Sequence, residues 1–203
     1  MGVLSILRHP ALKPVKRATR NLWWTYKGRT ILNPPLPSSV RRVLFICLGN
    51  ICRSPFAEVI AVQRARDVAG KPFAFGSAGI STRSGSGPPA EARDVAAKFG
   101  VSLDAHQPTQ LTQELAEAQD LLVVMESQQA DVLRTTFPHL ANRVLLLSLY
   151  DAEASAGVDR YNIADPFGLE ERAFHDCYTR IDRAVGALLS TLENRRSQPS
   201  ATR

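Results

Sequence analysis

No apolar run in this sequence of 203 residues is long enough to cross a lipid bilayer. The longest runs, Val43 to Leu48 and Leu121 to Met125, have about a third of the roughly 20 residues that a transmembrane helix needs. An apolar patch near the start, Val3 to Leu7, is too short for the core of a signal peptide, and Arg8, His9 and Pro10 follow it. We therefore expect a cytoplasmic protein that is neither secreted nor membrane-spanning.

Cysteine is scarce as well. The three cysteines, Cys47, Cys52 and Cys177, are too few and too unevenly spaced for a disulfide scaffold, and they suit a reducing compartment. No second Cys/His pair accompanies them at the spacing of a zinc site, so we expect no structural metal. We also expect no cofactor, because the chemistry suggested below uses side chains and backbone groups alone.

Acidic residues are absent from the first 42 positions, which hold nine basic residues. The rest of the chain has 16 basic and 19 acidic residues, so the first part carries about +9 and the remainder about −3. The overall pI of about 9.6 therefore describes the N-terminal extension rather than the body of the protein. We do not expect nucleic-acid binding on the strength of that pI.

The N-terminal extension, residues 1–40, is interrupted by prolines and is predicted to be partly disordered or to form a short helix between Val15 and Thr30. Trp23, Trp24 and Tyr26 lie there among basic residues. Such a segment could bind an anionic membrane surface or a partner, which would make the protein peripheral at a membrane. The same composition fits an organellar presequence or a solvated tail, and these alternatives stay open.

The body, residues 41–194, alternates short apolar runs with helical patterns, and residues 195–203 are predicted to be a frayed tail. Four runs are predicted to be buried strands: Val43–Cys47, Phe73–Ala78, Leu121–Met125 and Val144–Leu147. Helices are predicted over about 54–70, over Pro88–Phe99, over about 128–136 and along an apolar stripe from Phe174 to Leu192. This alternation predicts a three-layer, doubly wound α/β fold with a four-stranded parallel sheet, of the flavodoxin-like type.

The loop after the first predicted strand is the main candidate for chemistry, because reactive loops lie at the carboxyl ends of such strands. It runs from Cys47 through Leu48, Gly49, Asn50, Ile51 and Cys52 to Arg53 and Ser54. Successive backbone N–H groups in such a turn, backed by a helix N-terminus, form a site for a tetrahedral oxyanion. Gly49 and Asn50 tolerate left-handed backbone angles, and Ser54-Pro55 is predicted to cap and open the helix.

The side chains of this loop suit nucleophilic attack on a phosphate. Arg53 can bind two phosphate oxygens through its planar fork. The positive field of the loop favours the thiolate form of Cys47, and Ser54 can donate its hydroxyl to that sulfur. A buried cysteine that merely ends a strand is the alternative, because a cysteine and an arginine at this spacing also occur by chance. The strand, loop, proline and helix in this order favour the functional interpretation.

The segment VLFICLGNICRSPFAE resembles the signature of the low-molecular-weight protein tyrosine phosphatases, and the resemblance extends from about Arg42 to Leu192. It implies that Cys47 is the nucleophile, that Arg53 clamps the phosphate and that tyrosine-phosphorylated proteins are the partners. The family has a second signature, an Asp-Pro pair, which matches Asp165-Pro166 here. The resemblance implies that Asp165 is the general acid; by itself, an aspartate before proline is commonly only a turn residue.

Further matches concern the surroundings of the loop. Ser77 and His106 resemble residues that brace the loop asparagine, Asn50. Cys52 resembles a cysteine that forms a reversible disulfide with the nucleophile, although a role in the core fits it equally well. Cys177 lies on the apolar helix face and is expected in the core.

Departures from the family pattern affect the predicted substrate cleft. Relatives often place an aromatic residue a few positions after the Ser77-Ala78-Gly79 segment, where this chain has Ile80-Ser81-Thr82-Arg83. Phe167 can provide one wall for a phenyl ring, and Arg83 would make the other wall cationic.

Three other functions are weighed against a tyrosine phosphatase. Arsenate reductases of this fold need further cysteines, and this chain has none between Cys52 and Cys177. Protein arginine phosphatases resemble this fold too, but they have threonine where this loop has Ile51. The branched apolar side chain of Ile51 favours phosphotyrosine as the substrate. A non-catalytic phosphate-binding module would not need every polar group that turnover requires, and all of them are present.

Overall fold

A computed structural model describes residues 33–37, 39–67, 73–83, 85, 87–154 and 158–197 of the chain. The helix predicted between Val15 and Thr30 lies outside these residues, as does most of the N-terminal extension. The end of the first predicted helix near Gly70 is outside them too.

Four parallel strands form one sheet, as the sequence predicts, and their order is β2-β1-β3-β4. Their bounds are Arg42–Cys47 for β1, Ala74–Gly79 for β2, Leu121–Val124 for β3 and Val144–Leu146 for β4. The chain leaves β1 first to one side and then returns to its other side. The carboxyl end of β1 is therefore the switch point where ligands bind in doubly wound folds.

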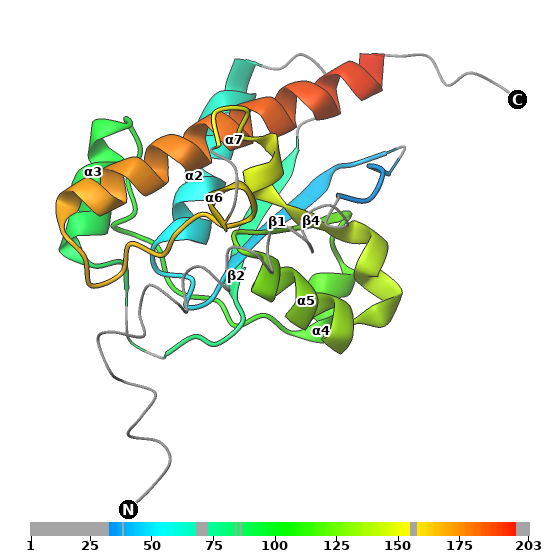
Figure 1. Cartoon of the computed structure of the whole chain (residues 1–203), viewed down its shortest axis with the longest axis horizontal. Coiled ribbons are helices and arrows are strands. Elements are labelled where there is room, and N and C mark those ends of the chain that lie inside the picture. The colour runs from blue at the N-terminus through cyan, green and yellow to red at the C-terminus, as the bar shows by residue number, and fades with distance from the viewer. Residues whose placement is uncertain are drawn as a thin grey trace, which may run out of the picture.

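Helices cover both faces of the sheet and complete the three layers (Figure 1). One face packs against α2 (Arg53–Arg64), α3 (Ala90–Lys98) and the long α7 (Glu171–Ser197). The other face packs against α4 (Gln113–Glu117), α5 (Ser127–Thr136) and the 3₁₀ helix η4 (Pro138–Arg143). Neighbouring strand residues such as Phe45 and Ile46 belong to opposite faces, so the runs are apolar throughout.

Several local predictions need correction. Helix α2 begins at Arg53, with Cys52 in the cap position, so Ser54 lies inside the helix and makes no side-chain cap. Its hydroxyl is used by Cys47 instead, as described below. Helix α7 continues through Ser197, so the first residues of the predicted tail are helical. The pattern also missed α4, the helix α6 (Val158–Tyr161) and three 3₁₀ helices: η3 (Ala65–Asp67), η4 and η5 (Leu147–Tyr150).

The described end of the N-terminal extension packs on the domain. The side-chain amide of Asn33 pairs with the backbone of Leu146 in the edge strand β4, donating to its carbonyl at 3.0 Å and accepting from its N–H at 2.7 Å. Leu36 and Val40 are buried in the larger core, and Arg196 of α7 donates to the Val40 carbonyl at 2.7 Å. The extension is thus fixed to the sheet at its junction with β1.

Among the residues that the structure describes, no helix is both long enough and apolar enough to cross a membrane.

Candidate active site

The loop between β1 and α2 curls around a point in front of the helix N-terminus. Its backbone reverses at Asn50, which has a φ of 54° and is the only residue other than glycine in the left-handed region among those described. Gly49, which also tolerates such angles, does not adopt them. Because Asn50 tolerates these angles better than most residues, the sequence can close the loop without a glycine there.

The sulfur of Cys47 lies at the carboxyl end of β1 and receives two hydrogen bonds from the loop. The backbone N–H of Asn50 donates to Sγ at 3.2 Å, and the hydroxyl of Ser54 donates to it at 3.0 Å. Cys47 is only 3% exposed, although it lines an open cleft. Two donors thus converge on one sulfur, an arrangement that suits a nucleophile which must later depart from phosphorus.

The side chain of Asn50 is fully buried and cross-links three parts of the fold. Its amide nitrogen donates to Ser54 and to Ser77, both at 2.9 Å, and its amide oxygen accepts from the N–H of Thr109 at 2.8 Å. Its backbone carbonyl lies 2.8 Å from Nε2 of His106. The structure therefore brings Ser77 and His106 to the loop asparagine, where the sequence comparison expected them.

Arg53 is 2% exposed and holds two carboxylates and a backbone carbonyl. Nη2 donates to Oδ2 of Asp165 at 2.7 Å, and Nη1 donates to the Ile163 carbonyl at 3.0 Å and to Glu126. Burial alone would lower the pKa of Arg53, but the negative charges of Cys47, Asp165 and Glu126 outweigh it and raise that pKa. Nε of Arg53 is buried and has no partner among the described residues.

The segment that carries Asp165 is fastened to the same edge of the sheet. The N–H of Ile163 donates to the Met125 carbonyl at 2.9 Å, and Oδ1 of Asn162 accepts from the N–H and the hydroxyl of Ser127. Beyond this anchor the segment opens to solvent: the side chain of Asp165 is 41% exposed and Phe167 is 59% exposed. The N–H of Phe167 donates to Oδ1 of Asp165 at 3.3 Å.

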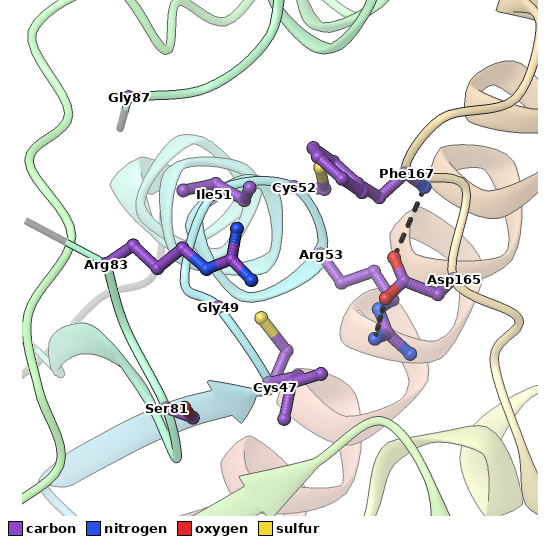
Figure 2. A pocket seen from close by; sticks show the side chains of 11 residues that line it. Cys47, Gly49, Ile51, Cys52, Arg53, Ser81, Arg83, Gly87, Asp165 and Phe167 are labelled. Atoms are coloured by element: carbon purple, nitrogen blue, oxygen red, sulfur yellow. Dashed lines mark hydrogen bonds and ion pairs between the residues drawn. The ribbon is translucent and has the colours of Figure 1, made fainter. Parts of the chain in front are cut away.

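Cys47, Arg53 and Asp165 line one cleft of about 340 Å³ (Figure 2). Of the predicted site residues, Asn50, Ser54, Ser77 and His106 brace the loop from behind and do not line the cleft. Phe167 and Arg83 approach the loop from opposite sides in this view. The cleft is lined by Cys47, Leu48, Gly49, Ile51, Cys52, Arg53, Ser81, Arg83, Gly87, Asp165 and Phe167.

The other two cysteines differ from Cys47 in their surroundings. Burial raises the pKa of Cys52, and the charge of Asp165 raises it further. Burial likewise raises the pKa of Cys177 to about 12. Both are therefore neutral thiols near neutral pH. None of the three cysteines forms a disulfide in this structure. Cys177 lies in the larger core, as predicted.

Sequence reasoning missed two carboxylates that support the site. Glu126 lies two residues after the end of β3 and bonds to Arg53, and Glu58 on α2 accepts a hydrogen bond from Ser77 at 2.7 Å. Glu126 had a detectable signal: an acidic residue at the carboxyl end of a buried strand next to β1 must lie near the loop. For Glu58 the sequence holds no signal of a role in the site, because its position on α2 shows only that it belongs to that helix.

Comparison with known proteins places this arrangement among phosphatases. The family model described as "Low molecular weight phosphotyrosine protein phosphatase" matches residues 42–198. The low molecular weight protein-tyrosine-phosphatase Etp of Escherichia coli is 32% identical over 142 residues, which cover 70% of this chain and 88% of Etp.

Solved structures agree on the fold. Wzb of Vibrio vulnificus in complex with benzylphosphonate superposes with a TM-score of 0.66 and 28% identity, covering 76% of this chain and all of that one. The YwlE arginine phosphatase of Geobacillus stearothermophilus has a TM-score of 0.68 at 24% identity, covering 80% of this chain and 99% of that one. The likeness to YwlE concerns the fold alone. The fold therefore does not distinguish a phosphotyrosine substrate from a phosphoarginine substrate.

Proposed function

This chain belongs to the low-molecular-weight phosphotyrosine protein phosphatase family, and we propose that it hydrolyses phosphotyrosine in proteins with Cys47 as its nucleophile. The observation that carries the assignment of roles is the pairing of Cys47 with Arg53 in one cleft. A sulfur that accepts two hydrogen bonds lines the same cleft as a buried guanidinium whose Nε has no partner among the described residues. A phosphate oxygen is a suitable acceptor for that nitrogen.

In the first step the Cys47 thiolate attacks the phosphorus of phosphotyrosine. The S–P bond forms as the bond from phosphorus to the phenolic oxygen breaks, leaving a phosphocysteine. The loop N–H groups and the dipole of α2 stabilise the oxygens of the phosphoryl group, whose charge is spread over them in the transition state. Arg53 adds a bidentate contact through Nε and Nη2.

Asp165 supplies the proton for the leaving group. When Nη2 of Arg53 turns to the phosphoryl group, the carboxylate of Asp165 loses its positive partner and takes up a proton from solvent. Asp165 then donates this proton to the departing phenolic oxygen and so releases tyrosine. In the second step water attacks phosphorus and the S–P bond breaks. Asp165 takes a proton from that water, and inorganic phosphate and the Cys47 thiolate are released, with Ser54 stabilising the sulfur.

The cleft walls favour phosphotyrosine over phosphoarginine. Leu48, Ile51 and Phe167 offer apolar surface to a phenyl ring. Arg83 adds a positive charge, which repels the guanidinium of a phosphoarginine. We therefore expect faster hydrolysis of phosphotyrosine peptides than of matched phosphoarginine peptides. The opposite order would assign this chain to arginine dephosphorylation.

Cys47→Ser tests the enzymatic function itself. The wild-type protein should hydrolyse para-nitrophenyl phosphate, and the serine variant should lose this activity by at least about 10⁴-fold because a serine hydroxyl has no comparable anion at neutral pH. Cys177→Ser is the matched control and should keep its activity. Equal turnover by Cys47→Ser and wild type would contradict the assignment of the nucleophile.

For the N-terminal extension we propose a tethering role toward an anionic membrane surface, supported by nine basic and no acidic residues in its first 42 positions and by Trp23 and Trp24. Co-sedimentation with anionic vesicles should be strong for the full chain at low salt and weak at raised salt. A chain lacking residues 1–32 retains the packed junction at Asn33 and should not co-sediment. Equal behaviour of the two proteins would contradict the proposal.

A further inference from the structure

The segment after β2 lies along the phosphate loop and is bonded to its backbone. The N–H of Ile80 donates to the Cys47 carbonyl at 3.0 Å, and the N–H of Ser81 donates to the Leu48 carbonyl at 2.8 Å. The contact is close: a Cβ on Gly79 would lie 2.9 Å from the Leu48 carbonyl oxygen. The position of this segment is thereby tied to that of the loop.

Gln110 holds the same segment from its other side. Its side-chain oxygen accepts from the N–H and the hydroxyl of Thr82, both at 2.9 Å, and its side-chain nitrogen donates to the Ile80 carbonyl at 2.9 Å. The backbone from Ile80 to Thr82 is therefore fixed on two sides. The next residue, Arg83, starts from a defined place at the mouth of the cleft.

The side chain of Arg83 lines the same cleft as Cys47, Asp165 and Phe167. In Figure 2 it extends over the phosphate loop from the side opposite Phe167 and Asp165. Arg83 itself is exposed, so its guanidinium is at the rim and not at the floor, where the buried Arg53 lies.

The two arginines lie at different depths of the cleft and come from different segments. Arg53 bonds to Asp165 and Glu126 and is placed to clamp the phosphoryl group together with the loop N–H groups. Those groups already supply donors for a tetrahedral oxyanion. Arg83 comes from another segment and adds a second positive charge at the rim, where parts of the substrate beyond the scissile phosphate must pass.

We propose that Arg83 is a specificity-determining residue that binds the carboxylate of an acidic residue flanking the phosphotyrosine. A guanidinium suits this role because its planar fork matches a carboxylate with two parallel hydrogen bonds. The preferred substrates are then acidic phosphotyrosine peptides. This inference rests on the proposed function and names the class of protein sequence that the site selects.

The test compares phosphotyrosine peptides that differ in one flanking residue, glutamate against the isosteric glutamine, at each of the three positions on either side. For wild type, kcat/KM should be about fivefold higher for glutamate than for glutamine at one or more positions, the size typical of an exposed ion pair. Arg83→Gln should reduce this ratio to about one, and Arg83→Glu should invert it. Raised salt should reduce the wild-type ratio.

Arg93→Gln is the matched control, because Arg93 is a half-exposed arginine of α3 that pairs with Asp104 and does not line the cleft. It should keep the wild-type ratio. If wild type hydrolyses the glutamine peptides but shows no preference for glutamate, or if Arg83→Gln keeps the preference, the inference is wrong and the proposed function stands. If wild type hydrolyses no phosphotyrosine peptide at all, the proposed function itself fails.

Discussion

The phosphate loop and the Asp165 segment meet at Arg53 but are built in opposite ways. In the loop, Asn50, Arg53 and Ser54 are buried. Asn50 by itself makes hydrogen bonds to two other segments of the fold, β2 through Ser77 and the segment that holds His106 and Thr109. The Asp165 segment is anchored around Asn162 and Ile163 and through the bond of Asp165 to Arg53, and it then exposes Phe167 and Leu169.

This difference matches the two halves of the proposed reaction. The phosphoryl group is the same in every substrate, so a loop whose backbone is already in place can bind it without rearranging, and only the Arg53 side chain has to turn. The leaving group differs from substrate to substrate and must enter and depart on the exposed side. Substitutions in the loop should therefore affect all substrates alike, whereas substitutions in the Asp165 segment should depend on the leaving group.

The largest effect after loss of the nucleophile is expected for Arg53→Lys. Lysine keeps the charge but not the fork, so it cannot bind two phosphate oxygens and at the same time stay bonded to Glu126. We expect kcat to fall about 10³-fold for both para-nitrophenyl phosphate and phosphotyrosine. Steady-state kinetics with both substrates measures this, and Arg93→Lys serves as the control. A loss confined to one substrate would break the distinction between the two regions.

Asp165→Asn is expected to have the next largest effect, and an unequal one. Asparagine cannot donate a proton to the leaving group, so we expect about a 10²-fold lower kcat/KM for phosphotyrosine. Para-nitrophenolate leaves well without a proton, so the loss there should be about tenfold or less. An equal loss for both substrates would argue against Asp165 as the general acid.

Ser77→Ala should have a smaller effect that is again independent of the leaving group. It removes one acceptor of the buried Asn50 amide and the donor to Glu58. We expect a free energy of unfolding lower by about 1–3 kcal/mol and a kcat lower by about tenfold for both substrates. Thermal unfolding and kinetics measure the two effects. Ser190→Ala, which removes an exposed hydroxyl on α7, should change neither; a Ser77→Ala variant with unaltered kcat would show that the bracing is dispensable.

The smallest effect is expected for the alkylation of Cys52 as the pH is raised. Cys52 should stay unlabelled by iodoacetamide between about pH 6 and about pH 9. A raised pKa keeps a thiol protonated as pH rises, so burial protects Cys52 and Cys177 from alkylation over this range. Cys47, which lines the cleft, should be labelled in preference to both, and phosphate should protect it. Peptide mapping by mass spectrometry locates the label, and labelling of Cys52 in preference to Cys47 would contradict the assignment.

Much of this architecture could be predicted because its signals are local. Each strand is a short apolar run, buried on both faces of a parallel sheet, and the loop combines a cysteine, an arginine and a proline in chain order. The predicted strand ends differ from the observed ones by only one residue, as for Phe73–Ala78 against Ala74–Gly79. The family resemblance then identified Asp165, which lies 112 residues from Arg53 along the chain.

What could not be predicted depends on contacts between distant residues. Serine commonly caps a helix N-terminus, but Ser54 lies inside α2 and donates its hydroxyl to the Cys47 sulfur. This tertiary contact overrides the local preference for capping. Gln110 lies in an irregular segment, and only the fold reveals that it clamps Ile80 and Thr82. Short helices such as α4 and η5 have too few turns to show a periodic apolar face.

The most direct test of the central claim is to isolate the covalent intermediate. Asp165→Asn should slow hydrolysis of the intermediate more than its formation from para-nitrophenyl phosphate, so a phosphorylated enzyme should accumulate during turnover. After rapid acid quench, intact-mass and peptide analysis should find one phosphoryl group, on the peptide that contains Cys47. A phosphoryl group on any other residue, or turnover without any phosphorylated enzyme under these conditions, would contradict the account.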